Sequence, residues 1–583
     1  MKKTKIICTV GPSTDNVELL EQMLAAGMDI ARFNFSHGNH ANHAQRIAVV
    51  RLAAAKIKKP LALIADTKGP EMRLGNFAQD EVHLAPGDEF CLTTEDVIGT
   101  QAIAHVNYAG LPVEVQIGNA ILLADGLLSL EVIKIAGTKI YTKVVHGGNL
   151  SSRKRVAIPG LELKLPFLSA ADEEDIKFAV AQDMDYIAAS FVQKAADVLA
   201  IRKVLEDLGS ELGIIAKIEN EAGVRNINEI INVADGVMVA RGDLGVELPA
   251  EVVPLVQKEI IKQCNKAGKP VITATQMLES MITSYRATRA EASDIANSIF
   301  DGTDVIMLSG ETASGQYPLE AVQTMAKIAM RTEEALDYVK IFREKGIGAQ
   351  VNATDAISHA TVQIAQELDA NSIITITESG YTARMIAKYR PQAKVVAVSP
   401  RKDKVRRMQL YWGVYPLLGP ASENTDEVIE MSVACARENK FICEGNLAVV
   451  TAGVPVGKTG STNLIKVIKV GTKLVEGTGV GKKPVVGKVC RAITLSDFSD
   501  KFEAGDVLVV CGLENENARY AAKASAIIAE EGGFTSTAAI VGINYGIPVI
   551  VGATGALTKL TDGTEVTVDT ACGIVYKGKL NIK

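Results

Sequence analysis

Charged and polar residues follow short apolar runs at several places in the first part of the chain. These positions include Arg32, Asn34, Asp66, Thr67, Lys217, Glu219, Asp243 and Thr275. Ionised side chains are costly inside an apolar core, so we expect them at the rim of the domain that the apolar runs build. Arginine, lysine and carboxylates gathered at one rim indicate a site for an anionic substrate and a metal cation.

Lys217 and Glu219 are two residues apart, so on a strand both side chains project to the same side. Asp243 follows the next apolar run along the chain. Two carboxylates on adjacent strands, with no His or Cys nearby, suit a hard cation such as Mg²⁺ or Mn²⁺. The alternative is an ion pair that closes the end of the strands. The number of converging strand ends favours the metal site.

Neutral oxygen ligands are offered separately by Asn34, Ser36 and Thr67, with Asp66 beside them. One charge among several dipoles suits a monovalent cation better than a divalent one. The same residue types at strand ends also cap the helices that follow, so capping remains the alternative.

His37, His40 and His43 are spaced three residues apart. On a helix this spacing spreads three side chains over about 120°. We therefore expect capping and surface roles for them rather than a transition-metal site.

Several other chemistries lack their sequence signatures. The chain has no GxxxxGK[ST] loop, no evident nucleophile–base pair, and no HRD or DFG kinase signature. Positioning and charge neutralisation remain, and these are the main requirements of phosphoryl transfer.

Eight short, nearly continuous apolar runs alternate with helical patterns, such as 17–26, 195–208 and 251–267, in the first 340 residues. This order predicts an α/β fold with a closed (β/α)8 barrel, whose active site lies at the carboxyl ends of the strands. An open doubly wound sheet is the alternative. The predicted strands are 4–10, 29–35, 61–66, 186–191, 213–218, 236–240, 270–275 and 304–308.

The remaining segments predict three further domains. An insertion rich in short strands interrupts the barrel after the third strand, where a β-rich lid belongs. The barrel ends with a helix expected over 319–342. A second α/β unit (the C domain), a Gly- and Lys-rich linker and an extra C-terminal α/β domain follow it. The expected boundaries are 1–72 and 167–343 for the barrel, 73–166 for the lid, 344–473 for the C domain, 474–484 for the linker and 485–583 for the extra domain.

The composition is that of a soluble globular protein. The 583 residues are 47% apolar and 22% charged, and a net charge of −6 spread along the chain gives no reason to expect nucleic acid or a membrane as partner. We see no signal peptide and no apolar run long enough to span a bilayer. The eight scattered cysteines lack CxxC spacing, so we expect reduced core thiols and a cytoplasmic protein.

Taken in order, the strand ends closely resemble those of the pyruvate kinase family. The similarity runs from Lys5 to about Gly471. Its most specific stretches are DTKGPEMR (66–73), KIENEAGVR (217–225), MVARGDLG (238–245), ITATQMLESM (272–281) and MLSGET (307–312).

This resemblance implies transfer of the phosphoryl group of phosphoenolpyruvate to ADP, giving pyruvate and ATP in the last step of glycolysis. It implies that Arg32 holds the phosphoryl group and Lys217 stabilises the transition state. Backbone at Gly242 and Asp243, with Thr275, would hold the substrate carboxylate. The other implied roles are Mg²⁺ (or Mn²⁺) at Glu219 and Asp243, K⁺ at Asn34, Ser36, Asp66 and Thr67, and nucleotide contacts from Arg73 and Lys154.

Glu71 also follows the resemblance, since family members that work without K⁺ tend to carry Lys there, and we expect K⁺ dependence. A homotetramer is implied by the resemblance alone. Three departures lie outside the catalytic residues: Tyr285-Arg286-Ala287 replaces a proline-containing stretch, Ala124-Asp125 replaces paired Asp, and Arg155 stands where Gly is common. These affect lid closure and nucleotide affinity more than reaction type.

In the C domain, the segment 377–382 resembles the effector-phosphate loop of the family. A helix N-terminus rich in hydroxyl groups suits a phosphate, although ordinary capping is the alternative. Glu378 adds a negative charge, so fructose 1,6-bisphosphate, AMP and a sugar monophosphate all remain open as the phosphorylated allosteric effector. The candidate residues are Thr377, Ser379, Gly380 and Thr382.

The last hundred residues resemble the mobile phosphohistidine domain of phosphoenolpyruvate-utilising enzymes. The resemblance rests on the segments 532–541 and 546–552. Thr537 stands at the position of the phosphorylated histidine, and no His follows His359. A threonine hydroxyl lacks the nucleophilicity of imidazole, so we expect a non-catalytic, stabilising or regulatory domain.

Two other functions compete with this interpretation. The fourth domain suggests a dikinase or synthase, against which the missing His and the complete nucleotide-binding lid argue. A phosphoenolpyruvate-sensing regulator built on an inactive kinase is the second, against which the intact set Arg32, Lys217, Glu219, Asp243 and Thr275 argues.

Overall fold

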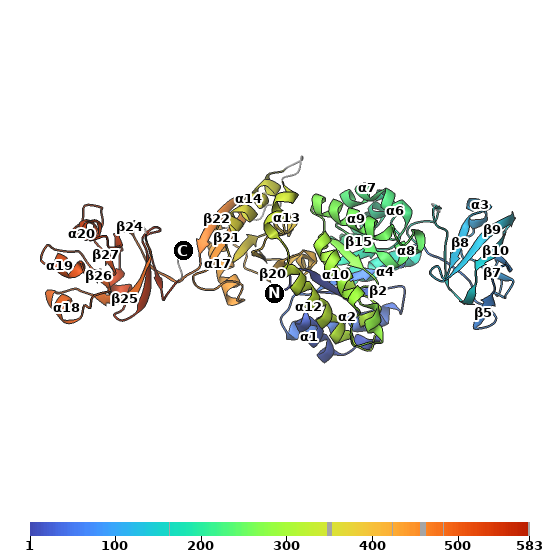
Figure 1. Cartoon of the computed structure of the whole chain (residues 1–583), viewed down its shortest axis with the longest axis horizontal. Coiled ribbons are helices and arrows are strands. Elements are labelled where there is room, and N and C mark those ends of the chain that lie inside the picture. Colours follow the sequence, from blue (N-terminus) through green and yellow to red (C-terminus); the bar gives the residue numbers. More distant parts are fainter. Residues whose placement is uncertain (162–163, 347–351, 423, 455–461, 482, 581–583) are drawn as a thin grey trace. The chain divides into compact units, whose positions relative to one another are not determined.

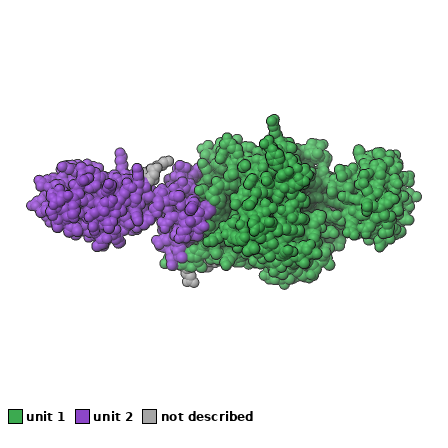
Figure 2. All heavy atoms as spheres, turned by 90° about the horizontal axis from the view of Figure 1, so that it is seen from below, with its two compact units in different colours: residues 1–362, 375–425, 452–463 green, residues 363–374, 426–451, 464–583 purple. Residues whose placement is uncertain are grey.

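The computed structural model describes residues 1–161, 164–346, 352–422, 424–454, 462–481 and 483–580. The chain forms two compact units, which Figure 2 shows in different colours. Unit 1 comprises residues 1–362, 375–425 and 452–463, and unit 2 comprises 363–374, 426–451 and 464–583. Within the described ranges, no helix combines the length and the apolar content that crossing a bilayer requires.

Eight parallel strands close a barrel in the order β1-β17-β16-β15-β14-β13-β3-β2. All eight predicted strands are present, so the predicted (β/α)8 barrel is confirmed and the open doubly wound sheet is wrong. The strands are β1 (Lys5–Thr9), β2 (Ile30–Asn34), β3 (Ala62–Asp66), β13 (Tyr186–Ala189), β14 (Gly213–Ile218), β15 (Gly236–Ala240), β16 (Val271–Ala274) and β17 (Val305–Leu308).

Both faces of these strands are buried, which explains their continuous apolar sequences. Alternate residues such as Ile7, Ile64 and Ile215 fill the barrel interior. The intervening residues, such as Ile6 and Ala216, pack against the surrounding helices. A filled interior leaves the strand ends as the place where charged side chains can reach a ligand.

The surrounding helices are seen with strands β2 and β15 in Figure 1. They include α1 (Val17–Ala26), α2 (His40–Lys56), α4 (Ala170–Ala181), α5 (Ala195–Asp207), α7 (Ile227–Val233), α9 (Val253–Ala267), α10 (Arg289–Asp301) and α12 (Pro318–Glu334). Three short helices, α6 (Glu221–Arg225), α8 (Arg241–Glu247) and α11 (Gly310–Ala313), directly follow strands β14, β15 and β17.

The continuous helix expected over 319–342 is wrong. The structure has two helices here, α12 and α13 (Tyr338–Lys345). The side chain of Asp337 accepts a hydrogen bond from the backbone N–H of Lys340 at 2.9 Å. This capping interaction starts a new helix where the apolar periodicity alone suggested continuation.

The insertion between β3 and β13 is rich in strands, as predicted. Seven strands form a sheet in the order β4-β12-β8-β9-β10-β6-β7, and β11 pairs with β5. A separate hydrophobic core, with Leu84, Phe90, Leu130 and Ile140 fully buried, lies under them. The elements are β4 (Met72–Arg73), β5 (Glu81–Leu84), β6 (Glu89–Thr93), β7 (Ile103–His105), α3 (Leu111–Glu114), β8 (Ala120–Leu123), β9 (Leu128–Ala136), β10 (Lys139–His146), β11 (Gly148–Ser151) and β12 (Arg155–Ala157).

The predicted C domain has a five-stranded sheet in the order β20-β19-β18-β21-β22. Its strands are β18 (Ser372–Ile376), β19 (Lys394–Ser399), β20 (Val414–Leu418), β21 (Leu447–Gly453) and β22 (Thr462–Lys469). Its helices are α14 (Ala353–Glu367), α15 (Tyr381–Lys388), α16 (Lys402–Arg407) and α17 (Thr425–Glu438).

The C-terminal part of unit 2 is built on an eight-stranded sheet in the order β23-β30-β29-β25-β26-β27-β28-β24. The strands are β23 (Lys473–Glu476), β24 (Thr478–Val480), β25 (Val485–Arg491), β26 (Val507–Val510), β27 (Ala526–Ala529), β28 (Val549–Val551), β29 (Glu565–Asp569) and β30 (Ile574–Lys577). The helices are α18 (Leu495–Asp500), α19 (Ala518–Ala521), α20 (Thr537–Tyr545) and α21 (Ala556–Lys559).

The prediction of a linker at 474–484 is wrong for its first part, because two strands of this sheet lie there. Strand β23 crosses the start of the expected linker, and β24 lies within it. Gly477 and Gly479 suggested a flexible connection, but here they permit close packing. A Cβ at Gly477 would lie 2.4 Å from the carbonyl oxygen of Val551, and one at Gly479 would lie 1.8 Å from that of Thr570. These glycines therefore serve the close approach of backbones rather than flexibility.

The cysteines differ in part from the expected core thiols. All eight are free, but only four are buried (Cys8, Cys91, Cys264 and Cys490). The histidines near residue 40 match the expected capping and surface roles only in part, because His43 is buried. Asn39 caps α2, His40 Nε2 lies 2.6 Å from Asp175, and the buried His43 lies 2.8 Å from the carbonyl oxygen of His37.

Candidate active site

Lys217, on β14, is the centre of a buried charge network at the barrel rim. Its Nζ lies 2.9 Å from Asp66 Oδ1, 3.0 Å from Glu219 Oε1 and 2.7 Å from Ser190 Oγ. Burial acts to lower the pKa of Lys217, but Asp66 and Glu219 outweigh it and raise that pKa above its ordinary value. Lys217 therefore stays positively charged and cannot act as a base at neutral pH.

Asp66, at the end of β3, holds Lys217 and Arg32 side by side. Arg32 Nε donates to Asp66 Oδ2 at 2.6 Å, and an NH1 hydrogen bond of 2.9 Å to Thr9 Oγ1 fixes the other side of the guanidinium. Burial acts to raise the pKa of Asp66, and the two cations lower it by more. The result is a carboxylate that brings two positive groups to one place.

Glu219 is a buried carboxyl that lacks full compensation. Its Oε2 accepts a 2.7 Å hydrogen bond from the backbone N–H of Phe191. Burial raises its pKa to about 7, and the nearby carboxylates of Asp243 and Asp66 add to this effect against the opposing charge of Lys217. A divalent cation between Glu219 and Asp243 would relieve this repulsion, so the donor set fits a hard metal ion.

In the part of the chain that the structure describes, no group of three or more His, Cys, Asp or Glu side chains is arranged to hold a metal. The Glu219–Asp243 pair offers two carboxylates. A Mg²⁺ site of one or two carboxylates, completed by substrate oxygens and water, is the usual arrangement in phosphoryl-transfer enzymes.

Gly242, Asp243 and Thr275 are brought together as the sequence predicts. The N–H of Gly242 donates to Thr275 Oγ1 at 2.7 Å. Arg241 holds the turn, because its NH2 group donates to the Thr275 carbonyl at 2.7 Å and its NH1 group pairs with Asp294 at 2.7 Å. Thr275 and Gln276 have positive φ angles of 68° and 54°, and such strain is typical of functional sites.

Asp243 is paired with Arg155, an arginine of the insertion. The Arg155 side chain is 9% exposed, and its guanidinium carbon lies 4.7 Å from the centroid of the Phe191 ring. The sequence marks Arg155 only as a departure from the family pattern. Nothing in it indicates contact with a predicted metal ligand, because the two residues are 88 positions apart.

The four predicted K⁺ ligands lie at the ends of two neighbouring strands. Asn34 and Asp66 are directly paired across β2 and β3. Asn34 Oδ1 accepts a hydrogen bond from the N–H of Ser36 at 3.1 Å, which is the expected alternative of local capping. Thr67 follows Asp66 and is buried, with its N–H donating to the Ala188 carbonyl at 3.0 Å.

The predicted nucleotide residues Arg73 and Lys154 lie on adjoining segments of the insertion. Arg73 is paired with Arg155 across β4 and β12. Its guanidinium is held by Glu71, with an NH2–Oε2 distance of 2.6 Å. The backbone carbonyl of the exposed Lys154 accepts from the N–H of Leu74 at 2.9 Å.

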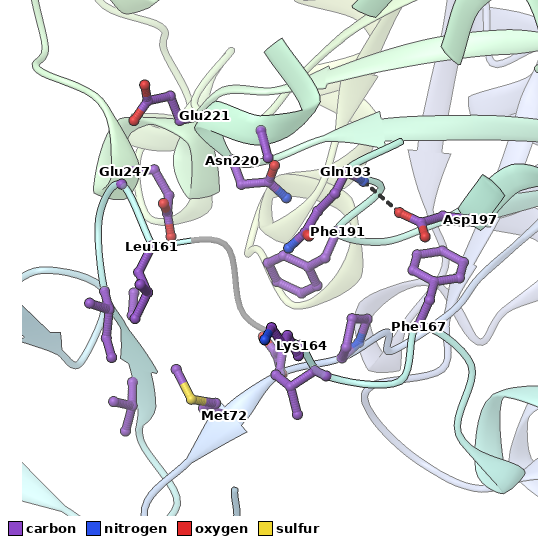
Figure 3. A pocket seen from close by; sticks show the side chains of 18 of the residues that line it. Met72, Leu161, Lys164, Phe167, Phe191, Gln193, Asp197, Asn220, Glu221 and Glu247 are labelled. Carbon is purple, nitrogen blue, oxygen red and sulfur yellow. Dashed lines mark hydrogen bonds between the residues drawn. The ribbon is translucent and has the colours of Figure 1, made fainter. Parts of the chain in front are cut away.

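A cavity of about 600 Å³ lies between these strands and the barrel rim. Figure 3 shows Phe191, Asn220 and Glu247 on its barrel side and Met72 on its insertion side. This volume is in the range that accommodates a small-molecule ligand. Burial raises the pKa of Glu247 to about 7, and the Arg155 guanidinium opposes that shift.

The predicted effector loop does precede a helix, α15. Within it, Thr377 Oγ1 accepts from the N–H of Gly380 at 3.0 Å, and Ser379 Oγ accepts from the N–H of Tyr381 at 3.4 Å. Thr382 Oγ1 lies 2.6 Å from Thr462 Oγ1. None of these contacts is a side-chain cap of α15, so they do not support the capping alternative, and the effector stays a prediction.

Ser190 and Thr9 contact the predicted site residues, and the sequence does not reveal them. Ser190 Oγ lies 2.7 Å from Lys217 Nζ and 3.3 Å from Asp66 Oδ1. Uncharged hydroxyls at the ends of apolar strands are too common to single out. Their only available signal is a position among the last two residues of a predicted strand.

Comparisons with known proteins cover the whole chain. The family model described as pyruvate kinase, barrel domain, matches residues 1–322, and that described as pyruvate kinase, alpha/beta domain, matches residues 355–468. The mobile domain of PEP-utilising enzymes matches residues 502–573.

Individual relatives agree. The pyruvate kinase of Geobacillus stearothermophilus is 49% identical over 585 residues and that of Staphylococcus aureus (strain MRSA252) is 44% identical over 584 residues. In both alignments, all of this chain and all of the relative are covered. The crystal structure of a pyruvate kinase from Cryptosporidium parvum has a TM-score of 0.77 at 40% identity, covering 80% of this chain and 96% of the other.

The raised pKa of Glu219 predicts pH-dependent metal binding in the absence of substrates. Below pH 7 a proton competes with the metal for this carboxyl, so the Mn²⁺ dissociation constant should rise as pH falls, by up to about tenfold per pH unit. Titration of free Mn²⁺ by electron paramagnetic resonance at several pH values measures it.

Glu247→Gln is the matched control, because Glu247 also has a pKa raised to about 7 but is not a predicted ligand. It should keep the pH dependence, whereas Glu219→Gln should lose most of the binding. An Mn²⁺ affinity that does not change with pH would contradict the assignment.

Proposed function

The chain belongs to the pyruvate kinase family, whose reaction gives pyruvate and ATP from phosphoenolpyruvate and ADP, and from this we propose how its barrel rim carries out the transfer. The chain is accordingly a phosphotransferase of glycolysis. The observation that carries the proposal is the buried network in which Asp66 pairs with both Arg32 and Lys217, and Glu219 pairs with Lys217.

Arg32 and Lys217 would act on the phosphoryl group by their positive charge. Both side chains are 9% exposed, so their fields are weakly screened and need little reorganisation during the transfer. The raised pKa of Lys217 keeps it protonated and supports a role in stabilising the transition state.

Gly242, Asp243 and Thr275 would hold the carboxylate of the substrate. Backbone N–H groups of Gly242 and Asp243 open helix α8, where an anion is favoured. The Gly242–Thr275 hydrogen bond of 2.7 Å keeps this turn in place. This anchoring would fix the phosphoryl group relative to the two cations.

Two cation sites complete the proposal. Glu219 and Asp243 would hold Mg²⁺ or Mn²⁺, and Asn34, Ser36, Asp66 and Thr67 would hold K⁺. Bound there, the metal ions would neutralise charge between the two polyanionic substrates. Asp66 would serve both its two cationic neighbours and K⁺.

The insertion would act as the lid that brings the nucleotide to the rim. Arg73 and Lys154 lie on its adjoining segments, and both would contact the nucleotide phosphates. We also propose the domain boundaries that the sequence predicts, apart from the corrected linker. A homotetramer, a cytoplasmic location and a phosphorylated effector at Thr377, Ser379, Gly380 and Thr382 are further proposals that rest on the family.

Lys217→Met should lower kcat by about 100- to 1,000-fold, because it removes a buried charge that acts on the transition state. A coupled assay of pyruvate formation, with ADP, Mg²⁺ and K⁺ each added or omitted, measures this. Replacing K⁺ with a large tetraalkylammonium ion should also abolish most activity. Lys262→Met, on the exposed face of α9, is the control.

The same assay separates the alternatives. Pyruvate formation that requires AMP with phosphate or pyrophosphate in place of ADP would favour a dikinase or synthase. Binding of phosphoenolpyruvate without turnover would favour a sensing regulator. Unchanged activity after K⁺ replacement would contradict the K⁺ site alone.

The C-terminal domain should not carry a phosphoryl group. Thr537 is the first residue of α20, and Ser536 before it caps the helix by accepting from the N–H of Ala539 at 3.3 Å. After incubation with phosphoenolpyruvate, intact-mass analysis should therefore find no phosphate on the wild-type protein or on Thr537→Ala. Phosphate found on the wild-type protein but not on Thr537→Ala would overturn the non-catalytic assignment.

A further inference from the structure

Arg155 connects the insertion to the barrel at a residue of the proposed metal site. It begins strand β12, and its guanidinium pairs with the carboxylate of Asp243 on α8. The Arg155 side chain is 9% exposed and that of Asp243 is 35% exposed. This is therefore a partly buried ion pair between two segments that are distant in sequence.

A second contact holds the guanidinium in place. Its central carbon lies 4.7 Å from the centroid of the Phe191 ring, within the distance of a cation–π interaction. Phe191 in turn donates its N–H to Glu219 at 2.7 Å. Arg155 thus contacts one proposed metal ligand directly and packs on the residue that fixes the other.

The local charge explains why a cation belongs here when no metal is bound. Glu221 and Glu247 line the same cavity as Arg155, and the charges of Glu221 and Asp243 both act to raise the pKa of Glu247. Without a positive group, these carboxylates would repel one another. Arg155 supplies that charge from within the chain, at the carboxylate that a divalent cation would also need.

We propose that Arg155 is an internal cation that competes with the divalent metal for Asp243 and holds the insertion against the barrel rim until the metal displaces it. This inference rests on the proposed function, specifically on Asp243 as a metal ligand. Because the guanidinium and the metal compete for one carboxylate, metal binding loosens the insertion and release of Arg155 tightens metal binding.

The test measures Mn²⁺ binding to the full-length protein without substrates. Arg155→Gln removes the competing charge and should lower the Mn²⁺ dissociation constant by about three- to tenfold, as expected for a partly buried ion pair. Arg153→Gln is the matched control: Arg153 is an exposed arginine two positions away that donates to Asn76 at 2.9 Å. It should leave the dissociation constant unchanged.

Asp243→Asn separates this inference from the proposed function. If Asp243→Asn leaves Mn²⁺ affinity unchanged, the metal assignment itself fails. If it abolishes binding while Arg155→Gln binds Mn²⁺ no more tightly than Arg153→Gln, only the competition fails.

Hydrogen exchange of the wild-type protein is a second measurement that does not depend on the folding of any variant. Mg²⁺ alone should increase amide exchange in and beside β12, because the Arg155–Asp243 contact is released. In Arg155→Gln, exchange there should already be high and should not respond to Mg²⁺. Unchanged or reduced exchange in the wild-type protein on adding Mg²⁺ would overturn the proposal.

Discussion

The contact of Lys217 with Asp66 and Glu219 is the constraint on which the rest of the site depends. A lysine this deeply buried is tolerated only with carboxylates beside it, and these carboxylates are tolerated only with cations. Asp66 satisfies part of this requirement through Arg32. Glu219 is left with excess negative charge, and this leads to the metal site.

The barrel makes such a network possible because its interior is filled. Apolar side chains such as Ile64, Ile215 and Met238 occupy the space between the strands. The charged residues follow at the strand ends, where several strands converge and each contributes one or two groups. Helices behind the strands bury these groups from the outside, which preserves the strength of their interactions.

Much of this arrangement could be predicted from the sequence. Nearly continuous apolar runs located all eight strands, and the residues at their ends identified Lys217, Glu219, Asp243 and Thr275 as neighbours. Contacts between residues that are distant in sequence could not be predicted in the same way, because Arg155 reaches Asp243 only through the fold of the insertion. Local signals also misled: Gly477 and Gly479 resembled a linker but permit close strand packing, and the Asp337 cap divides one predicted helix.

Anomalous diffraction from crystals containing Mn²⁺ would locate the divalent cation at the barrel rim. We expect an anomalous peak within coordination distance of both Glu219 and Asp243, with Lys217 still paired to Asp66 and Arg155 withdrawn from Asp243. Manganese bound elsewhere, with the Glu219–Lys217 and Asp243–Arg155 contacts both intact, would contradict it.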